Sequence, residues 1–134
     1  MVTKHIHQDV SIKILLVDDE INYVNVLANR LAKRNIFATR TYTGTQAIQA
    51  LRKEDFDVVI LDLKLEDMDG IEVLKIMKKM VPDVNVIMLT GHGSEEAARE
   101  GLREGAYDYL TKPCAFADLI YKIREVYDRH KGIR

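Results

Sequence analysis

The segment DVVILDLKLEDMDG, residues 57–70, contains four consecutive apolar residues, Val58 to Leu61, followed directly by a carboxylate, Asp62. A run this short and this rich in β-branched residues is typical of a strand that is buried on both faces. Such strands occur in parallel sheets whose two faces are covered by helices. The segment therefore predicts an inner strand of an α/β domain with an acidic side chain at its carboxyl end.

Further apolar runs extend this pattern in both directions along the chain. Besides 58–61, strands are predicted at 12–17, 36–39, 84–89 and 107–110. They alternate with longer segments of helical periodicity, and no repeat, low-complexity tract or linker interrupts the alternation. This order predicts one doubly wound domain with a five-stranded parallel sheet and right-handed crossovers.

Apolar residues at helical spacing predict a helix after each strand. Three helices have broad apolar stripes, formed by Ile21/Val24/Leu27/Ala28/Leu31, by Ile71/Leu74/Met77 and by Phe116/Leu119/Ile120/Ile123/Tyr127. The helices near 45–53 and 94–103 have thinner stripes, formed by Ala47/Ile48/Leu51 and by Ala97/Ala98/Gly101/Leu102. We expect the helix at 94–103 to be the most movable element, because a thin stripe buries little apolar surface.

Composition narrows the classes of function. At 134 residues, 47% hydrophobic and 31% charged, the chain has the size of one domain with a substantial core. A formal net charge of −1 argues against nucleic acid or an anionic membrane as its ligand. There is no bilayer-length apolar stretch and no secretory signal, and the single Cys114 cannot form an internal disulfide, so we expect a cytoplasmic setting. We expect a flexible leader at 1–11, the domain at 12–130 and a tail at 131–134.

Polar side chains follow four of the five predicted strands, at the sheet edge where doubly wound domains bind ligands. These residues are Asp18, Asp19 and Glu20, then Asp62, then Thr90, then Thr111 and Lys112. Carboxylates gathered in one place repel one another unless a cation joins them, and oxygen ligands favour Mg²⁺ or Mn²⁺ over zinc. Magnesium usually keeps coordination positions for water and phosphate, so this edge predicts a phosphoryl-transfer site.

Four segments resemble one family in order and spacing. LLVDDE (15–20), VVILDLKLEDMDG (58–70), VIMLTGHGS (86–94) and GAYDYLTKP (105–113) are similar to motifs of response regulator receiver domains, the CheY-like superfamily of bacterial two-component systems. The resemblance covers residues from about 13 to about 129. It implies a flavodoxin-like fold with strand order 2-1-3-4-5. It also implies a cytoplasmic signalling domain that accepts a phosphoryl group from a sensor histidine kinase or phosphotransfer protein. Its only catalysis would be its own Mg²⁺-dependent phosphorylation and slow autodephosphorylation.

The resemblance assigns the acidic residues to two roles. Asp62 corresponds to the phosphoacceptor nucleophile. Asp19, Asp62 and the backbone carbonyl of Lys64 correspond to the metal-binding set, and Asp18 would support the ion through a water or a hydrogen bond. The expected cofactor is Mg²⁺, with Mn²⁺ as a substitute.

The resemblance also implies a switch. Lys112 would pair with a phosphoryl oxygen, and the Lys112–Pro113 peptide is expected to be cis. Thr90 would turn its hydroxyl toward the phosphoryl group and vacate space for the ring of Tyr109, which changes the surface at 94–129. Lys64 and His92 occupy positions that tune loss of the phosphoryl group.

This surface commonly forms a symmetric dimer in relatives, often through charge pairs. We expect weak, phosphorylation-enhanced self-association or binding of a separate partner, with Asp108, Asp118 and Lys122 as candidate pairing residues. The segments LTGHGS and GAYDYLTKP look like those of receivers attached to enhancer-binding transcription activators.

One departure and two alternatives stand beside this interpretation. Where many receivers have Met-Pro after the phosphoacceptor strand, this chain has Leu65-Glu66, which favours a looser loop or a different mode of metal binding. One alternative is a pseudo-receiver that acts only as a binding module, independent of phosphorylation. The other is a haloacid dehalogenase-like phosphatase, which typically needs a second Asp at position 64, where this chain has Lys.

Overall fold

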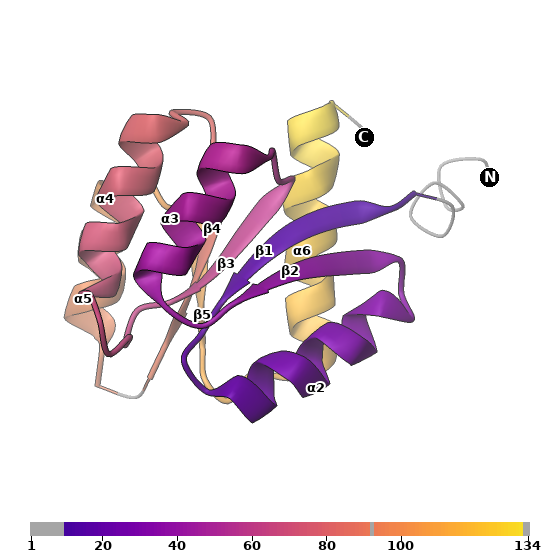
Figure 1. Cartoon of the computed structure of the whole chain (residues 1–134), viewed down its shortest axis with the longest axis horizontal. Coiled ribbons are helices and arrows are strands. Elements are labelled where there is room, and N and C mark those ends of the chain that lie inside the picture. The colour runs from indigo at the N-terminus through magenta and orange to yellow at the C-terminus, as the bar shows by residue number, and fades with distance from the viewer. Residues whose placement is uncertain (1–9, 92, 133–134) are drawn as a thin grey trace.

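The computed structural model describes residues 10–91 and 93–132. The elements are β1 (Ile12–Val17), α2 (Ile21–Ala32), β2 (Ile36–Thr41), α3 (Gly44–Lys53), β3 (Val58–Asp62), α4 (Gly70–Met80), β4 (Val86–Thr90), α5 (Glu95–Arg103), β5 (Asp108–Thr111) and α6 (Phe116–Lys131) (Figure 1). Residues 1–9 of the predicted leader and 133–134 of the predicted tail lie outside the described residues, so the domain limits stay predictions.

The five strands form one parallel sheet in the order β2-β1-β3-β4-β5, which confirms the expected fold and topology. Between β1 and β3 the register pairs Val17 with Leu61. The next positions, Asp18 just beyond β1 and Asp62 at the end of β3, therefore lie side by side. Strand order thus brings together two carboxylates that are 44 positions apart in the chain.

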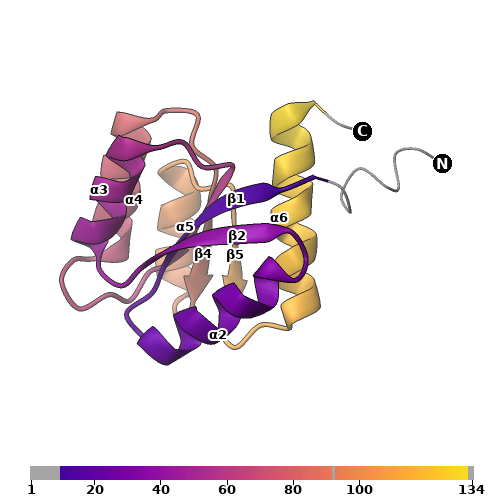
Figure 2. The same cartoon turned by 45° about the vertical axis from the view of Figure 1, so that its right-hand side comes forward.

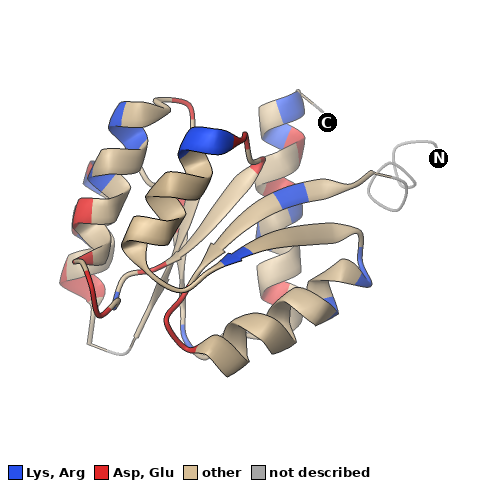
Figure 3. Ribbon diagram, viewed as in Figure 1, with Lys and Arg blue, Asp and Glu red and all other residues tan. Residues whose placement is uncertain are grey.

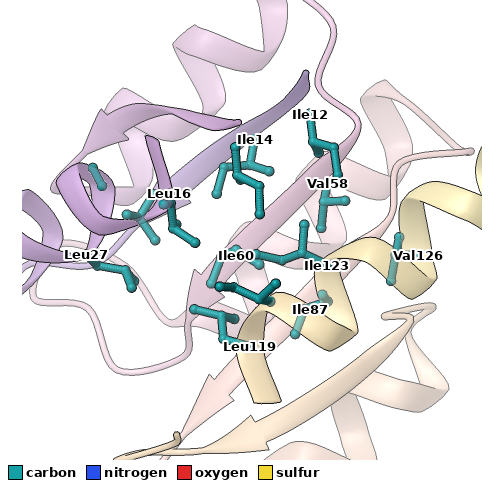
Figure 4. Packing of buried hydrophobic residues seen from close by; sticks show 14 of the residues in the cluster. Ile12, Ile14, Leu16, Leu27, Val58, Ile60, Ile87, Leu119, Ile123 and Val126 are labelled. Atoms are coloured by element: carbon teal, nitrogen blue, oxygen red, sulfur yellow. The ribbon is translucent and has the colours of Figure 1, made fainter. Parts of the chain in front are cut away.

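Helices cover both faces of the sheet, with α2 and α6 on one and α3, α4 and α5 on the other (Figures 1 and 2). Because strand side chains alternate between faces, Ile14 and Ile60 point into the cluster under α2 and α6, whereas Leu15 and Leu61 point into the cluster under α3 and α4. Figure 4 shows the first cluster, where Leu119 and Ile123 of α6 lie against these strand residues. Burial on both faces explains why the inner strands are apolar throughout.

Two predicted core positions are wrong. Ile21, assigned to the buried stripe of α2, is 56% exposed, and Leu102 of α5 is 39% exposed. Ile21 is the first residue of α2, beyond the end of β1, so no sheet lies beneath it. Helical periodicity identifies the inward face of a helix but not where the covering layer stops.

The α5 helix has the thin contact that its sequence predicted. Only Ala98 and Gly101 are buried among its residues, and Gly101 lies directly against the side chain of Met88 on β4. Ser94 precedes α5, but its side chain makes no capping hydrogen bond, contrary to the usual role of Ser at this position. Weak anchoring of α5 is consistent with a movable element, and its motion stays a prediction.

Candidate functional site

Buried polar side chains mark the carboxyl edge of the sheet. Of the described residues, those that are both polar and buried are Asp18, Thr41, Asp62 and Thr90. Each lies at or just beyond the end of a strand. Thr41 is accounted for structurally, because its hydroxyl donates to the carbonyl of Leu16. The other three lie at the ends of β1, β3 and β4, and the acidic connection that follows β1 is red in Figure 3.

Three carboxylates converge at this edge. One oxygen from each of Asp18, Asp19 and Asp62 lies within 4.8 Å of the others. Asp18 is fully buried, and its two oxygens accept hydrogen bonds from the Glu20 N–H at 3.0 Å and the Lys112 ammonium at 2.8 Å. Asp19 is only half-buried. Asp18 is therefore held by the protein, while Asp19 is the more accessible carboxylate.

Asp62 has an environment that opposes its negative charge. Its side chain carboxylate accepts a hydrogen bond from the Lys64 N–H at 3.0 Å, and the residue is only 6% exposed. Burial is the main reason that the pKa of Asp62 is raised to about 6, and the charge of Asp18 acts in the same direction. The Lys64 hydrogen bond and the Lys112 ammonium lower this pKa but do not cancel the rise.

A hard divalent cation fits this donor set. The three converging ligands are all carboxylate oxygens, which Mg²⁺ and Mn²⁺ prefer. A cation beside Asp62 would also favour its ionised form and so reverse the unfavourable effect of burial. The cluster can therefore hold a metal ion.

Lys112 is the cation that the chain itself supplies. Its Nζ lies 2.8 Å from Asp18, 2.9 Å from Glu20 and 3.5 Å from Asp62. Burial by itself would lower the pKa of Lys112, but the hydrogen bonds to Asp18 and Glu20 and the charge of Asp62 outweigh it and raise that pKa. Lys112 is therefore a fixed positive charge next to Asp62.

Thr90 and Tyr109 occupy neighbouring strands near this charge cluster. Thr90 ends β4 and is buried, whereas Tyr109 on β5 is 38% exposed. A pocket of about 210 Å³ is lined by Asp62 and Thr90 and extends to Ala97 of α5. The phosphoacceptor candidate, the candidate switch hydroxyl and α5 therefore share one open space.

Two residues at this edge were missed by the sequence analysis as partners of Lys112. Glu20 was assigned only to the acidic run, and Tyr23 was given no role, although its ring centroid lies 4.7 Å from the Lys112 Nζ. Their spacing could have indicated a shared role, because Glu20 and Tyr23 are three residues apart at the start of α2 and therefore lie on the same side of the helix. The cis Lys112–Pro113 peptide is confirmed. His92 lies outside the described residues, so its tuning role stays a prediction.

None of the described helices combines the length and the apolar character that a bilayer crossing requires.

Comparisons with known proteins agree with this geometry. Residues 14–124 match the family described as response regulator receiver domain. The chain is 38% identical over 109 residues to transcriptional regulatory protein ZraR of Escherichia coli K12, and 36% identical over 99 residues to regulatory protein LuxO of Vibrio cholerae. These matches cover 81% and 74% of this chain but only 25% and 22% of the relatives. The chain thus spans about a quarter of the length of these regulators.

Solved structures show the same likeness. A CheY-like receiver domain protein from Methanospirillum hungatei superimposes with a TM-score of 0.87 at 30% identity, covering 92% of this chain and 98% of that one. NtrX from Brucella abortus matches with a TM-score of 0.85 at 30% identity, over 91% of this chain and 28% of NtrX. Fold, strand order, acidic edge and sequence lead to one conclusion: this chain belongs to the receiver domains of two-component response regulators.

Proposed function

We propose that this receiver domain accepts a phosphoryl group onto Asp62 from a histidine kinase or a phosphotransfer protein, with Mg²⁺ as cofactor and Mn²⁺ as a substitute. The observation that carries the proposal is the position of Asp62: buried at the end of β3, beside Asp18 and Asp19, and 3.5 Å from Lys112. Family membership excludes the haloacid dehalogenase alternative. Labelling of Asp62 by a phosphodonor distinguishes this proposal from the pseudo-receiver alternative.

The chemistry needs a carboxylate nucleophile and neutralisation of charge. An oxygen of Asp62 forms a bond to phosphorus while the phosphorus–nitrogen bond of a phosphohistidine breaks, and the imidazole leaves with the electron pair. Lys112 offsets negative charge on the phosphoryl oxygens, as charge placement dominates phosphoryl transfer. A Mg²⁺ ion held by Asp19, Asp62 and the Lys64 carbonyl, with Asp18 in support, would supply the remaining positive charge. The domain catalyses no reaction beyond its own phosphorylation and slow dephosphorylation.

Asp19→Asn is expected to weaken Mg²⁺ binding by at least roughly 10-fold, because it removes the accessible carboxylate of the cluster. The affinity would be measured by calorimetric titration with MgCl₂. Asp83→Asn is the matched control, because Asp83 is an exposed acid ahead of β4, at the opposite edge of the sheet. Unchanged affinity in Asp19→Asn would place the ion elsewhere.

The loop after β3 contains two further acids, Asp67 and Asp69, whose hydrogen bonds disfavour them as metal ligands. Asp67 is bonded to the start of α3, and Asp69 accepts a hydrogen bond from the Ile71 N–H at 2.9 Å as the N-cap of α4. Both carboxylates therefore accept hydrogen bonds from backbone N–H groups in the first turn of a helix. This supports the cluster of Asp18, Asp19 and Asp62 as the metal site.

The proposed output mechanism links Thr90 to α5. A ligand shifts a conformational equilibrium only if it interacts differently with the two states, and a phosphoryl group can do so by accepting a hydrogen bond from Thr90 in one state alone. Movement of Thr90 would leave space for Tyr109 to turn inward. The thin contact of α5, through Ala98 and Gly101, is what would let this helix respond.

Thr90→Ala is expected to leave phosphorylation of Asp62 intact but to reduce the accompanying change in α5 and β5 by at least about half. The measurement is the change in amide chemical shifts over residues 94–110 on addition of beryllofluoride, an acyl-phosphate mimic. Thr111→Ala is the control, because Thr111 is the exposed partner of Thr90 in the register of β4 and β5. A full response in Thr90→Ala would exclude this residue as the coupling group.

The face formed by α5, β5 and α6 is also the proposed surface for self-association or partner binding. Two of the three expected pairing residues already bind each other within the chain: the Lys122 Nζ lies 2.8 Å from Asp108, and also 3.0 Å from Glu125. An ion pair between two protomers would have to replace these ion pairs within the chain. We therefore expect self-association to be weak. Because the matched relative ZraR is named a transcriptional regulatory protein, we propose that this receiver serves a regulator of transcription.

A further inference from the structure

The loop after the phosphoacceptor, residues 63–69, is fastened to the sheet at its base. The Leu63 N–H donates to the Leu89 carbonyl at 3.1 Å, and the Gly70 N–H donates to the Leu63 carbonyl at 3.1 Å. Lys64 and Asp69 face each other across the loop as an antiparallel bridge. This loop, called the acceptor loop below, is the one that lacks the Met-Pro pair.

Asp67 connects the tip of the acceptor loop to the start of α3 by hydrogen bonds. One carboxylate oxygen accepts a hydrogen bond from the Gly44 N–H at 2.9 Å, and the other accepts from the N–H and the hydroxyl of Thr45, both at 3.1 Å. The bond from Gly44, followed by those from Thr45, holds the pKa of Asp67 below its usual value. Three hydrogen bonds thus join the acceptor loop to the start of α3.

The first turn of α3 depends on these bonds. A helix start leaves four backbone N–H groups without a partner in the helix itself. One of them, the Gln46 N–H, donates to the Thr43 hydroxyl at 3.0 Å, and the Thr43 carbonyl accepts the first hydrogen bond of the helix itself, from the Ala47 N–H at 3.1 Å. Two more, on Gly44 and Thr45, donate to Asp67. The negative charge of Asp67 also suits the positive end of the helix dipole.

We propose that Asp67 is a positioning residue for the metal site. Lys64 lies between the fastened base and the fastened tip, and its carbonyl is the backbone ligand in the proposed function, on which this inference rests. Asp67 stabilises the loop conformation that holds this carbonyl in place. It does so without coordinating the ion, because Asp67 is not among the described acids whose oxygens converge, which are Asp18, Asp19 and Asp62.

The test compares Asp67→Ala with Glu66→Ala. Glu66 is the exposed neighbour, so both variants remove one negative charge from the same loop, and the difference between them isolates the hydrogen bonds to α3. Asp67→Ala is expected to bind Mg²⁺ roughly 10-fold more weakly than Glu66→Ala, a typical effect of losing a group that orients a metal ligand. Asp67→Asn keeps an oxygen acceptor and is expected to fall between them.

A second readout needs no metal. In the metal-free protein, the amide protons of Gly44 and Thr45 are expected to exchange faster in Asp67→Ala than in Glu66→Ala, while amides of the inner strands keep their protection. If Asp67→Ala fails to fold, Asp67→Asn compared with Glu66→Gln carries the same test.

The outcomes separate this inference from the proposed function. If the wild type binds no Mg²⁺, the proposed function fails, whatever the exchange rates show. If the wild type binds Mg²⁺ and Asp67→Ala binds it as tightly as Glu66→Ala, Asp67 only stabilises α3 and the inference is overturned.

Discussion

Asp62→Asn is expected to abolish phosphodonor-dependent mass gain while leaving the fold intact. An amide oxygen is a poor nucleophile, but Asn has nearly the shape of Asp and can still accept the hydrogen bond from the Lys64 N–H. The substitution also removes a charge whose burial is unfavourable, as the raised pKa of Asp62 indicates. Loss of labelling would therefore mean loss of the nucleophile and not loss of the fold, because nothing in the structure requires the variant to unfold.

The measurement is intact-protein mass spectrometry after incubation with a small acyl-phosphate donor and Mg²⁺. The control is Asp55→Asn, which alters an exposed acid ahead of the same strand and should label like the wild type. Labelling of Asp62→Asn at the wild-type rate would show that another residue is the acceptor. A wild type that does not label at all would instead favour the pseudo-receiver alternative.

Gly70→Ala is expected to cause the largest loss of stability among the substitutions considered, about 2–3 kcal/mol in the free energy of unfolding. Gly70 is the first residue of α4, and a Cβ there would overlap the backbone of Leu63, with the carbonyl carbon only 2.7 Å away. Leu63 cannot easily retreat, because its N–H and carbonyl are bonded to Leu89 and Gly70. The added methyl group must therefore break contacts at the base of the acceptor loop.

Urea unfolding followed by circular dichroism would measure this loss. Gly91→Ala is the matched control: a Cβ at Gly91 meets nothing within 4 Å, so the change should stay within about 0.5 kcal/mol of the wild type. Equal unfolding midpoints for the two variants would contradict the close approach of Gly70 to Leu63.

The sequence alone predicted the sheet and most of the carboxyl edge. Inner strands such as β3 are apolar at every position before the edge because both faces are covered, and this pattern is visible without a structure. Asp18, just after β1, and Asp62, the last residue of β3, follow from the rule that ligand sites lie at the carboxyl ends of parallel strands. Their pairing also needed the strand order, which came from resemblance to a family and not from periodicity.

Tertiary structure decided the contacts that join elements distant in the chain. No local sequence pattern indicates that Lys112 lies closer to Asp18 and Glu20 than to Asp62. Nor does any local pattern indicate that Asp67 accepts a hydrogen bond from Thr45, 22 residues earlier, at the start of α3. Exposure of Ile21 likewise depends on where the sheet ends beneath α2. Periodicity and strand-end chemistry are local properties of the chain, so the sequence specifies them. Side-chain partners depend on how the helices pack on the sheet, and only the folded chain brings those groups within hydrogen-bond distance.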